Sequence, residues 1–519
     1  MEDETPGSHS HVSRRSVLRT IASTPVLLLG ACGRSTQTDL SGYWVMLIPN
    51  PDGTSRKAFW HLQQSGQAVS GNVMFGSREI PITNGSFKDG KLHFEVVLHF
   101  QHEAHKVSYD GVMKGNQFAV TVSFAGRKPI SGTAERTTRE ATLPPAPLPL
   151  PALHDVRDNG LVRTPPMGWN SWNKFAGRVD DAVVRAAADA MIASGMHKAG
   201  YTYINIDDTW QGPRDAKGNI TTNRKFPDMK ALAAYVHSKG LKIGIYSSPG
   251  PTTCAGYTGS FGHEAQDAKT YAEWGFDYLK YDWCSAGEIY KDNQMRPVYQ
   301  VMGDALLKVG RPIVFSLCQY GRDDVWTWGS KVGGNSWRTT GDISDHWKRM
   351  DEIGFKQFDI QKYMRPGHWN DPDMLEVGNG GMTNDEYRTH MSLWCLLAAP
   401  LLAGNDLHSM TNDTKEILMN REVIAVDQDK AAHPARVIGP LGDEVVAARK
   451  LSDGSTAVAL FNRGDQAEEI GVEWSALGLE SKSLHARDIW KHEPARVSRT
   501  HYSTKVPSHG VAMLRVRAA

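Results

Sequence analysis

The sequence predicts an α/β protein: a central (β/α)8 TIM barrel followed by an antiparallel β-sandwich and preceded by a small all-β domain. Two patterns predict this fold. In the middle of the chain, eight short apolar runs alternate with amphipathic helical stretches, as the strands and helices of a barrel do. On either side of that region, apolar and polar residues alternate singly in short runs, which is typical of antiparallel strands.

The composition suits several folded domains. The chain has 519 residues, of which 40% are apolar, enough for more than one core. Its formal net charge is +1, so nothing indicates a nucleic-acid partner or binding to an anionic membrane surface. Fifteen Trp residues are a high count. Exposed Trp often stacks on sugars, but most of these are expected to fill cores.

Residues 1–32 have the layout of an export signal. The twin-Arg run SRRSVLR (13–19) precedes TIASTPVLLLGA, an apolar stretch too short to span a bilayer. The stretch ends in LGAC, which resembles a bacterial lipobox with Cys32 as the lipidated residue. We expect an exported lipoprotein that faces the periplasm or cell exterior and touches the membrane only through Cys32. An ordinary signal peptide is the alternative, and Tat or Sec export both stay open.

The N-terminal β domain is expected over residues 38–138. Runs such as KLHFEVVLHF and QFAVTVSF alternate apolar and polar residues and are separated by DGK and KGN turns, with no convergent catalytic cluster. Residues 139–158 contain TLPPAPLPLP, which reads as a stiff, extended linker.

The barrel is expected over residues 159–432. Its eight strand-like runs are MGWNSW, YTYINIDDTW, LKIGIYSS, DYLKYDWC, PIVFSLCQ, SWRTTGD, HWNDPDML and APLLAGNDL. Several helical stretches between them end in Gly, a usual residue just past a helix. A doubly wound sheet is the alternative, but no GxGxxG follows a strand. Alternating runs such as EVVAARKL and TAVALFNR then predict the β-sandwich over residues 433–519.

Charged residues gather at the ends of the predicted strands, where a barrel places its catalytic groups. These residues are Asp207, Asp208, Lys280, Asp282, Arg338, Asp342, Asp371 and Asp373. A single Asp after a strand is as often a helix cap, but acids at four strand ends, accompanied by Trp, indicate a site or mutual ion pairs. Two carboxylates across a glycosidic bond supply a nucleophile and a general acid, and the other charged groups suit sugar hydroxyls. No HExxH, CxxC, GxSxG or GK[ST] motif indicates a metal or another chemistry.

At these residues the sequence resembles glycoside hydrolase family 27, the α-galactosidase family. The matching segments are MGWNSW, INIDDTW, CAGYTGS, LKYDWC, NSWRTTGDI and GHWNDPDML, in that order. The resemblance implies a retaining exo-hydrolase that releases terminal α-D-galactose from oligosaccharides or polysaccharides and needs no cofactor or metal. It implies that Asp282 is the nucleophile and Asp342 the acid/base, with carboxyls about 5–5.5 Å apart.

The resemblance also assigns the residues that bind the sugar. They are Trp169 at the pocket floor, Asp207 and Asp208 at the 6- and 4-hydroxyls, Lys280 at the 3- and 4-hydroxyls, Gln319 and Arg338 near the 2-hydroxyl, Tyr246 on the wall and Asp373 near the ring. It pairs Cys254 with Cys284 in a disulfide, leaves Cys318 free, and makes Asp371 a structural carboxylate. Gln319 stands where the family often has Glu, which leaves specificity at the 2-position open.

Two electrostatic expectations follow. Lys280 lies two residues from Asp282 on the same strand, so it faces the same side and should favour the ionised carboxylate. Asp342 should have a raised pKa through neighbouring carboxylates. Three rival functions remain: hydrolysis of β-L-arabinopyranosides, hydrolysis of α-N-acetylgalactosaminides, and a surface protein that binds glycans without turnover. Keeping both Asp207 and Asp208 favours galactose, because the arabinoside lacks the 6-hydroxymethyl group.

Overall fold

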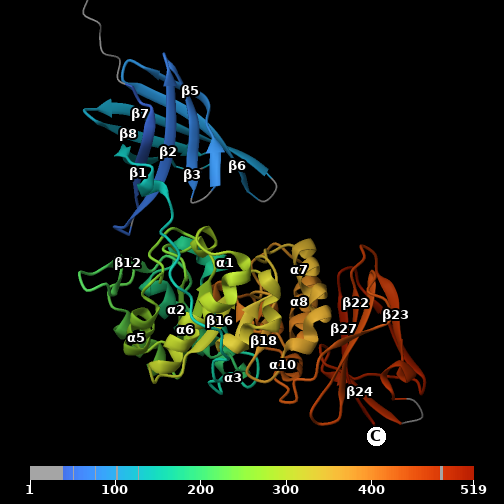
Figure 1. Ribbon diagram of the computed structural model, residues 1–519. Coiled ribbons are helices and arrows are strands. Elements are labelled where there is room, and N and C mark those ends of the chain that lie inside the picture. The colour runs from blue at the N-terminus through green and yellow to red at the C-terminus, as the bar shows by residue number, and fades with distance from the viewer. Residues whose placement is uncertain are drawn as a thin grey trace, which may run out of the picture. The chain divides into compact units, whose positions relative to one another are not determined.

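The middle of the chain forms an eight-stranded parallel barrel in the computed structural model (Figure 1). Its strands are β10 (Met167–Asn170), β11 (Tyr203–Asn205), β14 (Lys242–Ser247), β15 (Tyr278–Asp282), β16 (Val314–Cys318), β17 (Ser336–Arg338), β18 (Trp369–Asp371) and β19 (Leu401–Ala403). They pair in the order β18-β17-β16-β15-β14-β11-β10-β19, and a parallel bridge between Leu375 and Ala403 closes the ring. All eight predicted runs contain a strand, so the predicted (β/α)8 barrel is confirmed.

The structure describes residues 39–50, 52–75, 78–100, 103–124, 126, 128–479 and 483–518. The predicted export signal and Cys32 lie outside these residues. Residues Ser41–Ala519 form one compact unit. Among the helices that the structure describes, none has both the length and the apolar character needed to cross a membrane.

The helices of this region follow the barrel strands in the chain. They are α1 (Trp172–Phe175), α2 (Asp181–Ser194), α3 (Met196–Ala199), α4 (Met229–Ser238), α5 (Glu264–Trp274), α6 (Met295–Lys308), α7 (Trp347–Gly354), α8 (Asn384–Leu397), α9 (Asn412–Leu418) and α10 (Arg421–Asp427). Local sequence sets their ends: the Asp180 side chain caps the start of α2, and Gly195 ends it with a φ of +85°. A short hairpin, β12 (Gln211–Arg214) and β13 (Ile220–Thr222), extends the loop after β11.

The N-terminal domain is a closed antiparallel barrel, which confirms the predicted all-β domain. Its strands are β1 (Gly42–Pro49), β2 (Ser55–Ser65), β3 (Ala68–Phe75), β4 (Arg78–Pro81), β5 (Thr83–Lys88), β6 (Lys91–Phe100), β7 (Glu103–Lys114), β8 (Gln117–Phe124) and β9 (Ile130–Thr137). Neighbours in the chain pair with each other except β4 and β5, and β9 pairs back with β1, which closes the ring. Strands β4 and β5 share the place beside β3.

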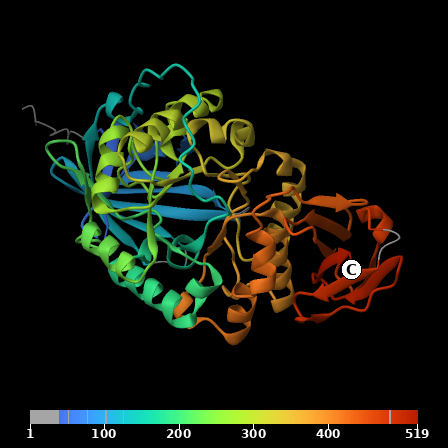
Figure 2. The same cartoon turned by 90° about the horizontal axis from the view of Figure 1, so that it is seen from below.

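The C-terminal domain has two antiparallel sheets, as the predicted sandwich requires. Six strands form one sheet: β20 (Arg436–Ile438), β21 (Glu444–Lys450), β22 (Thr456–Asn462), β27 (Val511–Ala518), β24 (Leu484–Asp488) and β25 (Glu493–Pro494). Strands β23 (Glu468–Glu473) and β26 (His501–Val506) form the other. The apolar core of the parallel barrel continues into β21, β22 and β27, and Figures 1 and 2 show these red strands beside the orange helices.

Candidate active site

A cavity of about 670 Å³ opens at the carboxyl ends of the barrel strands. Eight of the ten predicted catalytic and sugar-binding residues line it: Asp207, Asp208, Tyr246, Lys280, Asp282, Arg338, Asp342 and Asp373. They come from strands β14, β15 and β17 and from the segments that follow β11, β17 and β18. Parallel strands all end at one rim of the barrel, so residues far apart in sequence meet there.

Asp282, the last residue of β15, is a buried carboxylate with hydrogen bonds to both oxygens. The Tyr246 hydroxyl donates to Oδ2 at 3.1 Å, and the Tyr320 hydroxyl donates to Oδ1 at 2.6 Å. Burial raises the pKa of Asp282 above its ordinary value, while Lys280 and Tyr320 act in the opposite direction. These donors hold the carboxylate in one orientation toward the cavity.

Lys280 lies on the same strand and also lines the cavity, as the strand period predicted. Its Nζ donates to Asp207 Oδ2 at 2.7 Å, and the Asn170 amide donates to the same oxygen at 2.9 Å. Burial opposes the charge of Lys280, but Asp207 and neighbouring acids raise its pKa well above the ordinary value. Lys280 therefore stays protonated and can donate to sugar hydroxyls.

Asp208 is almost fully buried beside Asp207. Its Oδ1 accepts from the Thr209 amide at 2.6 Å, and its Oδ2 accepts from the Ala255 amide at 2.8 Å. Burial raises the pKa of Asp208 to about 7, and the charge of Asp207 adds to the rise. Thr209 holds a φ of +83°, a backbone conformation that β-branched residues rarely adopt.

Asp342 sits at the exposed side of the cavity, with 70% of its side chain accessible. Arg338 Nη2 donates to Asp342 Oδ1 at 2.9 Å and lies 2.9 Å from Asp373 Oδ2. Partial burial acts to raise the pKa of Asp342, but the Arg338 charge outweighs it and the pKa is lowered. The prediction of a raised pKa is therefore wrong, because the hydrogen-bonded Arg338 guanidinium, together with the charge of Lys280, favours the ionised form of Asp342.

Two predicted residues lie outside the cavity lining. Trp169 is fully buried and its Nε1 donates to the Asn405 carbonyl at 2.8 Å, whereas Trp172 from the same motif lines the cavity. Gln319 is also fully buried, and its Nε2 donates to the Arg338 carbonyl at 3.0 Å. Of the two Trp residues in MGWNSW, Trp172 is therefore the one that lines the cavity. The Gln319 side chain instead hydrogen-bonds the backbone of β17.

Asp371 is buried and does not line the main cavity. Its Oδ1 accepts from the Asp373 amide at 2.9 Å, which orients the turn that carries Asp373. Burial raises the pKa of Asp371 to about 6. This placement agrees with the structural role expected for it.

Tyr320 contacts the predicted nucleophile Asp282 and was not predicted from the sequence. It directly follows Gln319 in SLCQYG, and its φ of +64° turns the chain so that its hydroxyl meets Asp282. The one sequence feature that points to Tyr320 is its position next to Gln319, a predicted sugar-binding residue. An aromatic residue after a strand is too common to identify by type alone.

The predicted disulfide between Cys254 and Cys284 is present, with Cα atoms 4.9 Å apart, and Cys318 is free and buried as expected. The Cys254–Cys284 disulfide joins the loop after β14 to the segment directly after β15, next to Asp282. Both sulfurs lie near the Asp282 carboxylate, but disulfide sulfurs are not the thiolates that bind metal ions.

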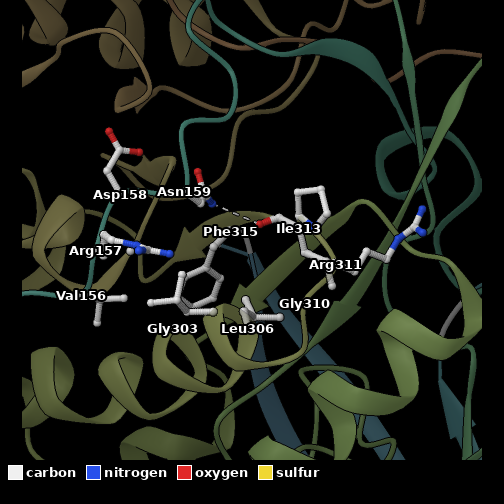
Figure 3. Close-up of a pocket in the computed structure, with 13 residues that line it drawn as sticks. Val156, Arg157, Asp158, Asn159, Gly303, Leu306, Gly310, Arg311, Ile313 and Phe315 are labelled. Atoms are coloured by element: carbon white, nitrogen blue, oxygen red, sulfur yellow. Dashed lines mark hydrogen bonds between the residues drawn. The ribbon is translucent and has the colours of Figure 1, made fainter.

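A second cavity of about 340 Å³ lies at the amino ends of the strands (Figure 3). The linker residues Arg157 and Asp158 line it together with Asn159 and with Arg311 and Ile313, which precede β16. The Asn159 amide donates to the Ile313 carbonyl at 3.3 Å, the contact drawn in Figure 3. This end of a (β/α)8 barrel contributes to stability, and no acid pair faces this cavity.

Comparison with known proteins settles the family. The model described as alpha galactosidase A matches residues 164–429, and the model for the alpha galactosidase C-terminal beta sandwich domain matches residues 442–516. The chain belongs to the alpha galactosidase A family. Family membership and the geometry agree, because the matched residues contain the whole cavity lining described above.

Relatives within the alpha galactosidase A family are similar over most of their length. An alpha-galactosidase from Cyamopsis tetragonoloba is 48% identical over 363 residues, covering 69% of this chain and 87% of the relative. Alpha-galactosidase I from Mortierella vinacea superposes with a TM-score of 0.68 at 40% identity, covering 70% of this chain and 99% of that one.

A third relative extends further. A Bacteroides fragilis structure assigned as an alpha-galactosidase/melibiase has a TM-score of 0.66 at 31% identity, and the match covers 92% of this chain and 98% of that one. The first family model starts at residue 164 and the second at residue 442, so the N-terminal barrel lies outside the matched family core.

Proposed function

We propose that this protein is a retaining exo-acting hydrolase that releases terminal α-D-galactose from α-galactosides. The observation that carries the proposal is the position of Asp282: a buried carboxylate with both oxygens hydrogen-bonded to tyrosines, facing the same cavity as the more exposed Asp342. One carboxylate is fixed for attack, and the other is accessible for proton transfer.

The reaction proceeds in two displacements. An Asp282 oxygen attacks the anomeric carbon while the bond to the leaving oxygen breaks, and protonated Asp342 gives its proton to that oxygen. Asp342, now ionised, takes a proton from water as the water oxygen attacks the anomeric carbon and breaks the ester bond to Asp282. Galactose leaves with its original anomeric configuration, and Asp342 carries the proton again.

The low pKa of Asp342 bears on these two steps differently. An ionised Asp342, which Arg338 favours, suits the second step, where it acts as a base. The first step needs protonated Asp342, and the population of that form falls as the pH rises through its pKa. Asp207, Asp208 and Lys280 supply the charged acceptors and donors that a sugar's hydroxyls require.

The decisive experiment replaces the nucleophile. Asp282→Ala should lower turnover of 4-nitrophenyl α-D-galactoside by at least about 10⁴-fold, and added azide should restore turnover by attacking the anomeric carbon in its place. Asp189→Ala, a surface acid that pairs with Lys239 on the outside of the barrel, is the matched control. Near-normal activity of Asp282→Ala would refute Asp282 as the nucleophile. If NMR of the wild-type reaction shows β-galactose as the first product, the retaining mechanism is refuted.

We further propose that the protein is exported and anchored through Cys32. The twin-Arg run, the short apolar stretch and LGAC support this, and the Cys254–Cys284 disulfide suits an oxidising compartment. Mass spectrometry of the N-terminus of the membrane-associated protein should find a lipidated Cys32, and Cys32→Ala should release the protein from membranes. An unlipidated mature N-terminus elsewhere would refute the anchor.

A further inference from the structure

Residues 52–54, between strands β1 and β2, bring a buried carboxylate from the N-terminal barrel to the rim of the catalytic barrel. Asp52 is 6% exposed. Its Oδ1 accepts from the Thr54 amide at 2.9 Å and from the Thr54 hydroxyl at 2.6 Å, which fixes the side chain within the hairpin. The other oxygen, Oδ2, points away from the hairpin's own donors and takes its partners from the catalytic barrel.

The first of these partners is Tyr257, whose hydroxyl donates to Asp52 Oδ2 at 2.6 Å. Tyr257 closes a tight turn with Thr253: the Thr253 amide donates to the Tyr257 carbonyl at 2.8 Å, and the Tyr257 amide donates to the Thr253 hydroxyl at 3.0 Å. This turn contains Cys254 of the disulfide and Ala255, whose amide donates to Asp208. Asp52 therefore contacts the loop that supplies one hydrogen bond to the sugar-site carboxylate.

The second partner is Asn223, whose Nδ2 lies 3.4 Å from Asp52 Oδ2. The same Nδ2 donates to the Thr209 carbonyl at 2.8 Å, and Thr209 supplies the other backbone hydrogen bond to Asp208. The strained φ of Thr209 needs such support from its surroundings. Asp52 thus touches both segments that orient Asp208, one from each side.

The hairpin tip fits closely at this place. The Arg224 amide donates to the Asp52 carbonyl at 3.3 Å, and a Cβ on Gly53 would lie 2.5 Å from Arg224 Nε. Lys225, the next residue, donates from Nζ to the Thr209 hydroxyl at 2.7 Å. The cation and the three donors around Asp52 account for an ionised carboxylate at a buried position.

We propose that Asp52 is a positioning residue for sugar binding, and that through it the N-terminal barrel forms part of the substrate site. By holding the Thr253–Tyr257 turn and the Thr209 backbone, Asp52 fixes the two amides that orient the Asp208 carboxylate. The domain thereby acts on substrate affinity rather than on the bond-breaking steps, because no part of Asp52 reaches Asp282 or Asp342. This inference rests on the proposed α-galactosidase function.

The test uses the full-length protein and Asp52→Asn, which keeps the size of the side chain and removes the charge. We expect the KM for 4-nitrophenyl α-D-galactoside to rise about tenfold with kcat changed less than about twofold, since a lost binding contact affects mainly KM. Asp89→Asn, at the exposed β5–β6 turn of the same domain, is the matched control and should match the wild type.

Two further measurements keep the outcome clear. Tyr257→Phe removes the partner and should raise KM similarly, and the double variant should be no worse than either single one, because both remove the same contact. Calorimetric binding of D-galactose and L-arabinose, which lacks the 6-hydroxymethyl group, should show a larger loss for galactose. Calorimetry reports galactose affinity even if the wild type has no hydrolase activity, a result that would overturn the proposed function alone. Unchanged galactose affinity in Asp52→Asn, or equal loss for both sugars, would overturn the positioning role.

Discussion

The two barrels of this protein differ in the kind of side chain that they bury. The N-terminal barrel fills its interior with rings: Trp60 contacts Phe94 and Tyr109, and Trp44 contacts Phe118, between strands that are not neighbours in the sheet. The catalytic barrel buries carboxylates at one end, with Asp207 and Asp282 at most 5% exposed. Both are closed sheets, so closure alone does not decide where chemistry can occur.

Strand direction explains the difference. In the antiparallel barrel, each end mixes strand starts with strand ends, and most connections are short turns that leave little chain to carry functional side chains. The longer β1–β2 connection, which carries Asp52, is an exception. In the parallel barrel, all eight carboxyl ends meet at one rim, each followed by a longer connection. The buried acids there are tolerated because Lys280 and Arg338 pair with them.

Among the tests of this comparison, the largest expected effect is at Asp342 on the catalytic rim. Asp342→Asn should lower kcat/KM, which reports the first step, by about 10²–10⁴-fold for alkyl α-galactosides, because a poor leaving group needs a proton. The loss should be smaller for 4-nitrophenyl α-D-galactoside, whose leaving group departs without one. Rates on both substrates measure this, and an equal loss on the two would mean that Asp342 is not the general acid.

The next effect tests the apolar barrel at Leu62, a fully buried residue of β2. Leu62→Ala should reduce the free energy of unfolding by about 2–5 kcal/mol through lost burial and a residual cavity. The kcat at 25 °C should stay the same, because Leu62 lies in the other barrel and does not line the catalytic cavity. Thermal unfolding and steady-state kinetics measure both quantities.

The control for Leu62→Ala is Val112→Ala on β7, where the side chain is 49% exposed. Its unfolding free energy should change by no more than about 0.5 kcal/mol. A fall in kcat with Leu62→Ala, at a temperature where the protein stays folded, would contradict the separation of stability from chemistry between the two barrels.

Most of this fold could be predicted from the sequence, because the period of apolar residues and the order of the apolar runs indicate the strands and helices. The eight runs from MGWNSW to APLLAGNDL all contain barrel strands, and the strand ends they predicted for Asp282 and Arg338 are where the structure has them. Alternation within KLHFEVVLHF likewise predicted β6. These features depend on local pattern, which a single sequence contains in full.

What could not be predicted depends on side-chain direction outside regular strands. Trp169 and Trp172 belong to one motif, and only the turn from β10 into α1 decides that Trp172 reaches the cavity. The lowered pKa of Asp342 depends on a guanidinium that reaches it across a loop. The contact between Tyr320 and Asp282 depends on the left-handed backbone conformation of Tyr320, which no sequence period predicts.

The smallest expected effect concerns Tyr320 and depends on pH. Its hydroxyl donates to the ionised form of Asp282 and so lowers the pKa of that carboxyl. Tyr320→Phe removes the donor, so the pKa of Asp282 should rise and its ionised fraction should fall at acid pH. Because the nucleophile must be ionised, the loss in kcat/KM should be greatest at low pH, about tenfold, and should shrink as the pH rises. Tyr290→Phe, whose hydroxyl only accepts a hydrogen bond from the Leu148 amide, should leave the whole profile unchanged. If the ratio of wild-type to Tyr320→Phe activity were the same at every pH, Tyr320 would not affect the pKa of Asp282 and would act by its shape alone. Lys280 would then be the group that favours the ionised form of Asp282.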